Sequence, residues 1–280
     1  MLKTTHYDAV TRIDMSRTMA GRSFYWTTAY IVDGMMVDTG CAHTARELAK
    51  SLENKSLIRI VNTHSHEDHI GANGTLQQKR EGLEILAHPL ALPIMAEPRK
   101  LKPFHPYRRV MWGWPKPSNG QSVQNEELIK TKHYCFQVIY SPGHSPDHIC
   151  LYEREHCWLF TGDLFVGGKD RALRADYNIG QIISSLKYVA NLPIKKLFPG
   201  SARVRENPRE ELNFKISYLE KVGNRVLELH QKGRNVQAIA NSLFGGSMLF
   251  EFFTFGHFSR RHLVLSYLRH YSNKADHDNF

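Results

Sequence analysis

The sequence predicts an α/β protein followed by a small helical unit. Over roughly the first 206 residues, short apolar runs bounded by Gly, Pro and Asn alternate with segments of helical spacing. From Pro208 onward the spacing is helical throughout. The composition, 41% hydrophobic and 23% charged, is that of an ordinary globular protein, and 280 residues suffice for one large domain with an appendage. We therefore expect an α/β domain over 1–206, a helical unit over 207–271 and a disordered tail over 272–280.

Each element of the α/β domain follows from a local pattern. Residues 26–40, WTTAYIVDGMMVDTG, predict two strands joined by a hairpin turn at Asp33-Gly34. The other expected strands are apolar runs bounded by turns, at 56–61, at 83–89, at several places within 131–165, and at 195–201. The expected helices have apolar residues at helical spacing, at 44–55 and 181–193. Between Arg99 and Gln121 we expect an irregular loop, because Pro, aromatic and basic residues interrupt both patterns.

The helical unit has its own start signals. Asn207-Pro208 is a cap and first-turn signal, and it opens a predicted helix over 209–233. Asn235 and Ser259 are expected to cap two further helices, over 236–245 and 260–271.

Residues 62–73, NTHSHEDHIGAN, hold three histidines, one glutamate and one aspartate within six positions. They follow an apolar, strand-like run, so the cluster is expected where a strand ends in a loop. His64 and His66 are two apart, which in extended chain places both imidazoles on one side. A bend at Asp68 and His69 could aim these two side chains at a second point nearby.

Two later segments carry further candidate ligands at strand ends. His144 follows a Pro-Gly turn after the apolar run FQVIY, and Asp163 directly follows the run LFTG. Imidazole and carboxylate groups suit zinc, manganese or iron, and an aspartate can bridge two ions. The spacing and the residue types together predict a metal centre.

The order of these motifs resembles that of the metallo-β-lactamase-fold hydrolases. The motifs are VDTG at Val37–Gly40, HxHxDH at 64–69, PGHSPDH at 142–148 and FTGDLF at 160–165. The resemblance spans roughly Tyr30 to Ser201, and it is nearest to the glyoxalase II-like branch with a helical C-terminal extension. It implies a four-layer αβ/βα sandwich with a metal cleft at one edge of two facing sheets.

The resemblance also implies a set of ligands. Three histidines would hold one ion, an aspartate and a histidine would hold a second, and a further aspartate would bridge the two: His64, His66 and His144; Asp68 and His69; and Asp163. Zinc is the expected metal, as one or two ions, with manganese or iron as alternatives.

Three neighbouring residues are expected to have other roles. By the resemblance, Asp38 of VDTG would support the ligands from behind. His148 could orient a ligand in the same way, although a plain turn role fits the sequence equally well. Glu67, between the ligands, is expected to point to solvent.

The chain departs from the family pattern at Ser201. The family usually has a histidine after the Pro-Gly of LFPGS, where it completes the second metal site. A serine hydroxyl is a poorer zinc ligand than imidazole, so the second ion should be held more weakly. One bound ion and two bound ions both remain consistent with the sequence.

The expected chemistry is hydrolysis. A bound divalent ion lowers the pKa of its water from about 15.7 towards roughly 7, so a metal-bound hydroxide could attack an ester, thioester or related bond. By the resemblance, Asp68 would be the catalytic residue that orients this water and carries its proton. The sequence has no GxSxG motif and no phosphate-binding glycine loop, which argues against a serine hydrolase or a nucleotide-dependent enzyme.

The basic loop, residues 99–117, is the segment that could choose the substrate. It has six basic residues, no acid and several aromatic residues. Arg108, Arg109 and Trp112 are candidates to hold a small anionic substrate by charge and stacking. Equally, the aromatic residues could pack on the body of the protein while the charges are solvated.

Two other functions remain open. The formal net charge of +10 would suit a phosphodiesterase or nuclease, although nucleic acid is not the favoured partner, because no nucleic-acid module or basic stripe is evident. A metal-binding protein that recognises a signal or a partner, with little catalysis, is the third reading.

The cellular setting is expected to be the cytoplasm. No run of about eighteen apolar residues predicts a membrane span, and the start of the chain lacks the apolar stretch of a secretory signal. The four cysteines form no CxxC pair and no regular framework, as expected for reduced thiols. The oligomeric state cannot be read from the sequence.

Overall fold

The computed structural model describes residues 1–19, 21–101, 105–246 and 249–277, and its contacts divide the chain into two units. The first unit consists of Met1–Tyr140, Pro146–Val166 and Ile194–Asn207. The second consists of Ser141–Ser145, Gly167–Pro193 and Pro208–Phe280. The chain therefore crosses between the units at several points, whereas the sequence suggested a single boundary near Glu206.

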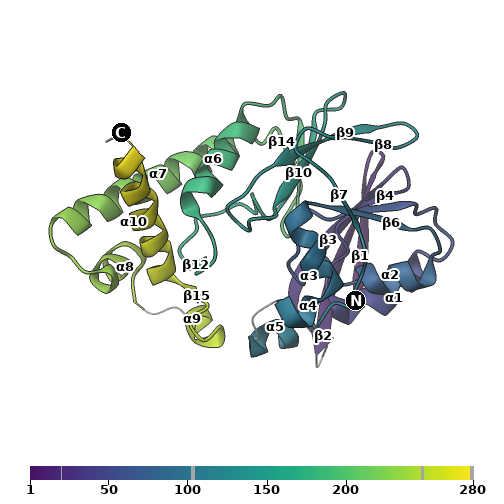
Figure 1. Ribbon diagram of the computed structural model, residues 1–280, viewed down its shortest axis with the longest axis horizontal. Helices are drawn as coiled ribbons and strands as arrows, with labels where there is room; N and C mark the ends of the chain where they lie inside the picture. Colours follow the sequence, from purple (N-terminus) through teal and green to yellow (C-terminus); the bar gives the residue numbers. More distant parts are fainter. Residues whose placement is uncertain (20, 102–104, 247–248, 278–280) are drawn as a thin grey trace. The chain divides into compact units, whose positions relative to one another are not determined.

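The first sheet holds seven strands among the described residues, and they are adjacent in chain order (Figure 1). They are β1 (Leu2–Tyr7), β2 (Val10–Met19), β3 (Arg22–Val32), β4 (Met35–Val37), β5 (Arg59–Val61), β6 (Glu84–Ala87) and β7 (Gln121–Ser122). The strands β1 to β4 are antiparallel neighbours, and β4 to β7 run parallel. Asp33 and Gly34 join β3 to β4 with φ of 49° and 77°. Positive φ at both positions is what the predicted tight hairpin requires.

The second sheet of the first unit is mainly antiparallel. In spatial order its described strands are β14 (Arg205–Glu206), β13 (Lys196–Pro199), β11 (Trp158–Gly162), β10 (Ile149–Glu153), β9 (Cys135–Tyr140) and β8 (Leu128–Lys130). Only β11 and β13 pair in parallel, and a register shift between Phe160 and Gly162 marks the end of β11. This end carries Asp163.

Both faces of the first sheet are buried, and successive side chains of a strand pack in different cores. Tyr30 and Val32 of β3 pack in the core that also contains residues of the second sheet, such as Phe160. Ala29 of β3 and Met36 of β4 belong to the core shared with the helices. Successive side chains of a strand point to opposite faces, so a sheet covered on both sides has nearly continuous apolar strands. Burial on both faces therefore explains the apolar runs from which these strands were predicted.

The helices of the first unit are short and lie between strands. They are η1 (Ala42–Thr44), α1 (Ala45–Ser51), α2 (Asn73–Lys79), η2 (Pro89–Ala91), α3 (Leu92–Ala96), α4 (Pro98–Leu101) and α5 (Pro106–Met111). α4 and α5 fall within the segment that we expected to be an irregular loop, where residues 102–104 lie outside the described part of the chain. Each begins at a proline, whose fixed φ suits the first turn of a helix.

The second unit is helical, with one small sheet. Its helices are α6 (Ile179–Ala190), α7 (Arg209–Gln231), α8 (Val236–Phe244), α9 (Leu249–Phe253) and α10 (Arg260–His277), and β12 (Leu173–Arg174) pairs with β15 (Phe258–Ser259). Asn235 caps α8 through Ala238 N, and Ser259 Oγ accepts the N–H of His262. Asn207 is not a cap, because its φ is 49° and α7 starts after Pro208. α10 takes in the expected tail up to His277, and 278–280 lie outside the described residues.

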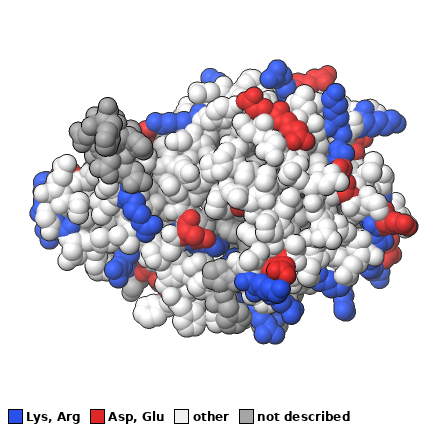
Figure 2. All heavy atoms as spheres, viewed as in Figure 1, with Lys and Arg blue, Asp and Glu red and all other residues white. Residues whose placement is uncertain are grey.

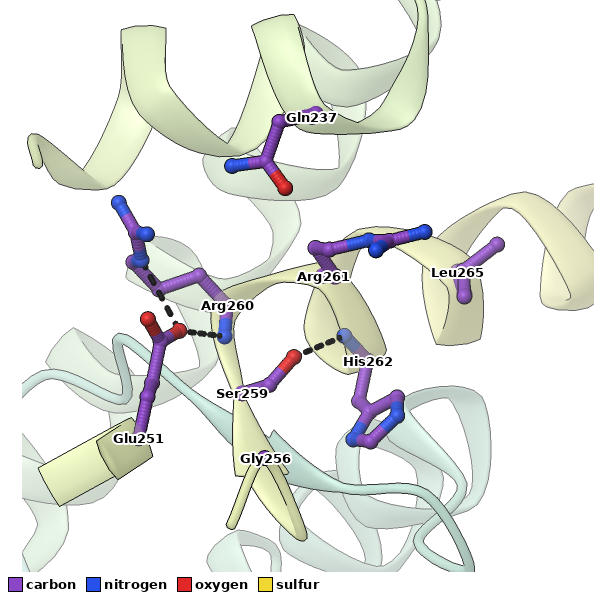
Figure 3. Close-up of a pocket in the computed structure, with 8 residues that line it drawn as sticks. All are labelled: Gln237, Glu251, Gly256, Ser259, Arg260, Arg261, His262 and Leu265. Carbon is purple, nitrogen blue, oxygen red and sulfur yellow. Dashed lines mark hydrogen bonds and ion pairs between the residues drawn. The ribbon is translucent and has the colours of Figure 1, made fainter. Parts of the chain in front are cut away.

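A pocket of about 360 Å³ lies within this helical unit (Figure 3). Glu251 accepts hydrogen bonds from the backbone and the guanidinium of Arg260, which fixes α9 to the start of α10. Arg260 is therefore occupied by an internal ion pair. None of the described helices is long and apolar enough to cross a membrane.

Candidate metal centre

The metal-binding loop, residues 62–73, follows β5 and runs into α2. Every residue from Asn62 to Ile70 is buried, including all three histidines. The N–H groups of His69 and Ile70 both donate to the carbonyl of His66, at 2.9 and 3.1 Å. This turn is the expected bend between the two halves of the motif. Buried imidazoles and carboxylates need hydrogen bonds or a cation, so their partners define the site.

His64 and His66 lie together at one end of the loop. Thr63 Oγ1 donates to Asp38 Oδ2 at 2.8 Å, so it accepts the Nδ1–H of His64 at 3.0 Å. This leaves Nε2 of His64 with its lone pair, 2.9 Å from Nδ1 of His66. The two ring centroids are 4.5 Å apart. The two-residue spacing thus brings one nitrogen of each ring to a common point.

His69 faces a second point, beside two carboxylates. Its Nδ1–H donates to Asp38 Oδ2 at 2.7 Å, so the network leaves Nε2 as the lone pair. Nε2 lies 3.5 Å from Asp163 Oδ2 and 3.9 Å from Asp68 Oδ2, and it is buried without a hydrogen-bond partner among the described residues. A lone pair that faces two negative oxygens suits a divalent cation. His64, His69 and Asp163 can each place one ligand atom within 4.8 Å of the others.

The pKa values reflect the same concentration of negative charge. Burial lowers the pKa of His69, but the carboxylates of Asp163, Asp38 and Asp68 outweigh it, so that this pKa is raised well above its ordinary value. Burial raises the pKa of Asp68 to about 6, helped by Asp163 and Glu67 and opposed by His69. Without a metal ion, a proton on His69 Nε2 would take the place of the cation.

Asp38 supports both halves of the loop. Its Oδ1 accepts the backbone N–H of Thr63 at 2.8 Å, and its Oδ2 accepts from Thr63 Oγ1 and His69 Nδ1. Asp38 is 2% exposed and has φ of 58°, a left-handed conformation that costs a non-glycine residue of the order of 1 kcal/mol. The carboxylate reaches Thr63 and His69 from this backbone, which is the supporting position expected of the VDTG aspartate.

His148 and Gly162 place the backbone of Asp163. His148 Nε2 accepts the N–H of Asp163 at 3.2 Å, and burial lowers the pKa of His148 to about 4, which keeps this imidazole neutral. Gly162 has φ of 47°, and a Cβ there would lie 2.6 Å from Thr63 Oγ1 and 2.8 Å from His148 Nε2. The glycine of FTGDLF is therefore required by close approach as well as by conformation.

His144 lies on the loop Ser141–Ser145, between β9 and β10, and this loop belongs to the second unit. Within that unit its Nε2 is 3.3 Å from the hydroxyl of Tyr177, and the two ring centroids are 4.4 Å apart. That His144 binds a metal ion remains a prediction.

Known proteins match the chain over this region. The family model for the metallo-beta-lactamase superfamily matches residues 27–201, which is more than half of the chain and includes the whole metal-binding loop. The chain belongs to the metallo-beta-lactamase superfamily.

Individual relatives agree with this membership. The chain is 29% identical over 169 residues to hydroxyacylglutathione hydrolase from Pelagibacter ubique, an alignment that covers 59% of this chain and 61% of that protein. It is 24% identical over 209 residues to atrochrysone carboxyl ACP thioesterase from Aspergillus fumigatus, covering 72% and 58%. The chain thus spans less than two thirds of the length of these two relatives.

A solved structure confirms the predicted fold class, an α/β sandwich of this superfamily with C-terminal helices. The crystal structure of a metallo-beta-lactamase family protein from Thermus thermophilus matches with a TM-score of 0.71 at 18% identity, covering 95% of each chain. At that identity the likeness concerns the fold alone.

Ser201 differs from the usual residue of the superfamily, and Tyr25 lies beside it. The Tyr25 hydroxyl donates to Ser201 Oγ at 3.2 Å. Desolvation of the hydroxyl raises the pKa of Tyr25, and the carboxylates of Asp163 and Asp68 raise it further, although the residue as a whole is 36% exposed. Sequence reasoning missed Tyr25, because a tyrosine in the aromatic stretch FYW of β3 has no motif around it.

Glu67 does not point to solvent, so that prediction is wrong. Glu67 and Arg108 are each 1% exposed, and Arg108 Nη2 donates to Glu67 Oε2 at 2.5 Å. A buried carboxylate needs a cation, and Arg108 of the basic loop provides one. Arg108 is therefore an internal ion-pair partner of the metal-binding loop, and its predicted role as an exposed contact for substrate is corrected.

The two other candidates for substrate binding have different surroundings. Arg109 is exposed, and its carbonyl oxygen is 3.1 Å from His43 Nε2. The Trp112 ring packs edge-on against Tyr25, with centroids 6.0 Å apart, and also contacts Tyr107. The assignment of Arg109 and Trp112 as substrate contacts remains a prediction. Of these two side chains, that of Trp112 lies against Tyr25.

Proposed function

We propose that the protein is a metal-dependent hydrolase that cleaves the ester or thioester bond of a small, anionic substrate. The observation that carries the proposal is the setting of His69. Its Nδ1 is held by Asp38, and its Nε2 faces Asp163 and Asp68 in a buried site. An imidazole fixed in this way by a carboxylate behind it is how proteins orient histidine ligands of metal ions.

The donor set fits zinc, as one or two ions, and manganese or iron are alternatives. In the proposed assignment, His64 and His66 hold the first ion together with His144. His69 and Asp68 hold the second, and Asp163 is shared between them. Ser201 leaves the second ion with fewer good ligands, so we propose that it is the more weakly held of the two.

A divalent ion bound there would supply Lewis acidity, both to acidify a water molecule and to polarise the scissile carbonyl. The residues of the chain supply position and proton transfer. Asp68 is 6% exposed and lies beside the second group of ligands, where its carboxylate would orient the water and accept its proton. Asp38 holds the proton of His69 on Nδ1, so that Nε2 keeps its lone pair, and His148 fixes the backbone of Asp163.

The names of the relatives support an acyl-transfer substrate. One is a hydrolase of hydroxyacylglutathione and another is a thioesterase. In both cases the bond would join an acyl carbon to sulfur. We infer a similar bond for this chain.

The charge of the chain supports an anionic substrate more than a nucleic acid. The formal net charge is +10. On the face shown in Figure 2, Lys and Arg side chains are scattered, with Asp and Glu between them, and do not form one continuous stripe. Proteins that bind nucleic acid usually gather such charges along the path of the backbone phosphates.

A panel of substrates tests the proposal. The purified protein, loaded in turn with zinc, manganese or iron, is assayed with an S-acylglutathione, a lactone, bis-p-nitrophenyl phosphate and RNA. We expect thioester hydrolysis that a chelator removes and that added metal restores. His66→Ala should be inactive, and His133→Ala should match the unaltered protein, because His133 is exposed and pairs with Asp33. Cleavage of only bis-p-nitrophenyl phosphate or RNA would establish the phosphodiesterase instead. Metal binding without turnover above the His66→Ala background would establish a metal-binding protein.

A further inference from the structure

A hollow of about 500 Å³ opens on the face of β1, β2 and β3 in the first unit. Its floor continues the face of β3 that packs between the sheets at Tyr30 and Val32. Thr28 and Trp26, two and four residues before Tyr30, share that face by strand alternation and line the hollow. The volume lies within the usual range for a small-molecule site.

The segment 199–201 connects the hollow with the metal centre. It follows β3 closely, because the Tyr30 hydroxyl donates to Pro199 O at 2.6 Å, Thr28 N donates to Gly200 O at 2.9 Å, and Tyr25 donates to Ser201. On its other side, a Cβ at Gly200 would lie 2.7 Å from both Asp163 Oδ1 and His69 Cε1. One short segment thus has the candidate ligands of the second ion against one side and the hollow against the other.

Tyr25 reaches the hollow because of an irregularity in the sheet. The pairing of β2 with β3 shifts register between Ser16 and Thr18, opposite Tyr25. Such a bulge redirects side chains, and both Tyr25 and Trp26 line the hollow although they are consecutive. The Tyr25 hydroxyl therefore stands where the hollow meets Ser201.

The charges in the hollow favour an anion. Arg12 donates three hydrogen bonds to the carboxylate of Asp14, at 2.7 to 2.9 Å, so these two charges compensate each other. Lys3 Nζ lies 4.6 Å above the ring of Trp26, and no carboxylate partner for it is found in the described part of the chain. The hollow therefore combines an aromatic surface, one uncompensated cation and three hydroxyl groups.

We propose that this hollow is a binding subsite for an organic carboxylate, and that Tyr25 is the positioning residue where the subsite meets the metal centre. The carboxylate of the ligand would lie near Lys3, and its apolar part would lie on Trp26. The Tyr25 hydroxyl would donate a hydrogen bond to the part of the ligand next to Ser201. The proposal rests on the proposed function, since it names the substrate class of the same centre.

Binding of a paired set of probes tests the subsite without turnover. 4-Nitrobenzoate and its neutral analogue 4-nitrobenzamide are titrated into the protein as purified, and the dissociation constants are measured by calorimetry. We expect the carboxylate to bind more tightly, and Lys3→Met to weaken its binding about three- to tenfold with little effect on the amide. Lys55→Met, an exposed lysine outside the hollow, is the matched control. Equal binding of the carboxylate to Lys3→Met and to the unaltered protein would overturn the subsite.

Tyr25→Phe tests the positioning role by two measurements. With an anionic substrate that the protein hydrolyses, we expect KM to rise about three- to tenfold, with a smaller change in kcat and no change in metal content. A fall in metal content would instead make Tyr25 a ligand, and an unchanged KM would overturn its role. The two proposals can fail separately. Lys3-dependent binding without hydrolysis of any substrate in the panel contradicts only the proposed function. Hydrolysis by a protein whose affinity for 4-nitrobenzoate is unchanged by Lys3→Met contradicts only the subsite.

Discussion

The metal-binding loop and the basic loop are both irregular segments rich in charged side chains, yet the protein holds them in different ways. In the metal-binding loop each of the three histidines has a hydrogen-bond partner, and Asp38 alone accepts three hydrogen bonds from the loop. In the basic loop Arg99 and Arg109 are exposed, whereas Arg108 is buried. Fixed side chains can hold an ion, whereas exposed ones can only attract a ligand.

The two loops meet at one ion pair, between Glu67 and Arg108. Glu67 is the acidic residue within the HxHxDH motif that binds no metal in the proposed assignment. Its buried charge is compensated by an arginine about forty positions later in the chain. The comparison teaches that spacing within one short motif is a better guide to function than composition, because each charge in a basic segment can face inward or outward.

Removing a ligand from the metal-binding loop should have the largest effect. His66→Ala deletes an imidazole whose nitrogen lies 2.9 Å from that of His64. We expect most of the bound metal and all measurable hydrolysis to be lost, a larger effect than the roughly 100-fold that loss of a supporting group costs. Elemental analysis and the thioester assay give the two readouts. His133→Ala controls for loss of an exposed histidine. If His66→Ala keeps a full complement of metal, the assignment of His66 is wrong.

The residues of the site that could be predicted from the sequence are those that lie close together within one short motif. His64, His66 and His69 share one turn, so their proximity follows from sequence spacing alone. Asp38 and His148 come from other strands, and the family resemblance suggested their supporting roles. Tyr25 could not be predicted, because its approach to Ser201 depends on a bulge in β3 and on the path of 199–201 along β3.

The fold could be predicted where strands are buried on both faces. β5, β6 and β11 read as apolar runs because helices or the other sheet cover them. β1 and β2 are not apparent in the sequence. β1 is an edge strand whose four central residues are exposed, so its side chains have no apolar alternation. The Pro-rich helices α4 and α5 were missed because each is too short to show helical periodicity.

Removing the ion pair between Glu67 and Arg108 should have the next largest effect, on the free energy of unfolding. Arg108→Ala leaves the carboxylate of Glu67 buried without its cation, which typically costs about 3–5 kcal/mol. The free energy of unfolding, measured with urea, should fall by about that amount. Arg109→Ala, the adjacent exposed residue, should change it by no more than about 0.5 kcal/mol. If the two variants are equally stable, Glu67 has another sufficient partner and the contrast between inward and outward arginines fails.

The pH dependence of metal binding should test whether the ion displaces protons from His69 and Asp68 of the metal-binding loop. Burial lowers the pKa of His69, but Asp163, Asp38 and Asp68 raise it well above its ordinary value, so the metal-free protein keeps a proton there to a higher pH than an ordinary histidine would. A cation must displace this proton, and its affinity therefore falls as the pH falls. Burial raises the pKa of Asp68 to about 6, so below that value a second proton must also leave.

For the more weakly held ion this predicts two slopes. Where the ion displaces the proton of His69, the dissociation constant should rise by up to about tenfold per pH unit as the pH falls. Below about pH 6, where Asp68 is protonated as well, it should rise by up to about a hundredfold per unit. Competition with a chelator of known affinity, at fixed ionic strength, measures both. Asp38→Asn should flatten the upper slope, because it removes one of the carboxylates that raise the pKa of His69. A dissociation constant that does not change with pH down to pH 5 would show that no proton leaves His69 when the ion binds, and His69 would then not be its ligand.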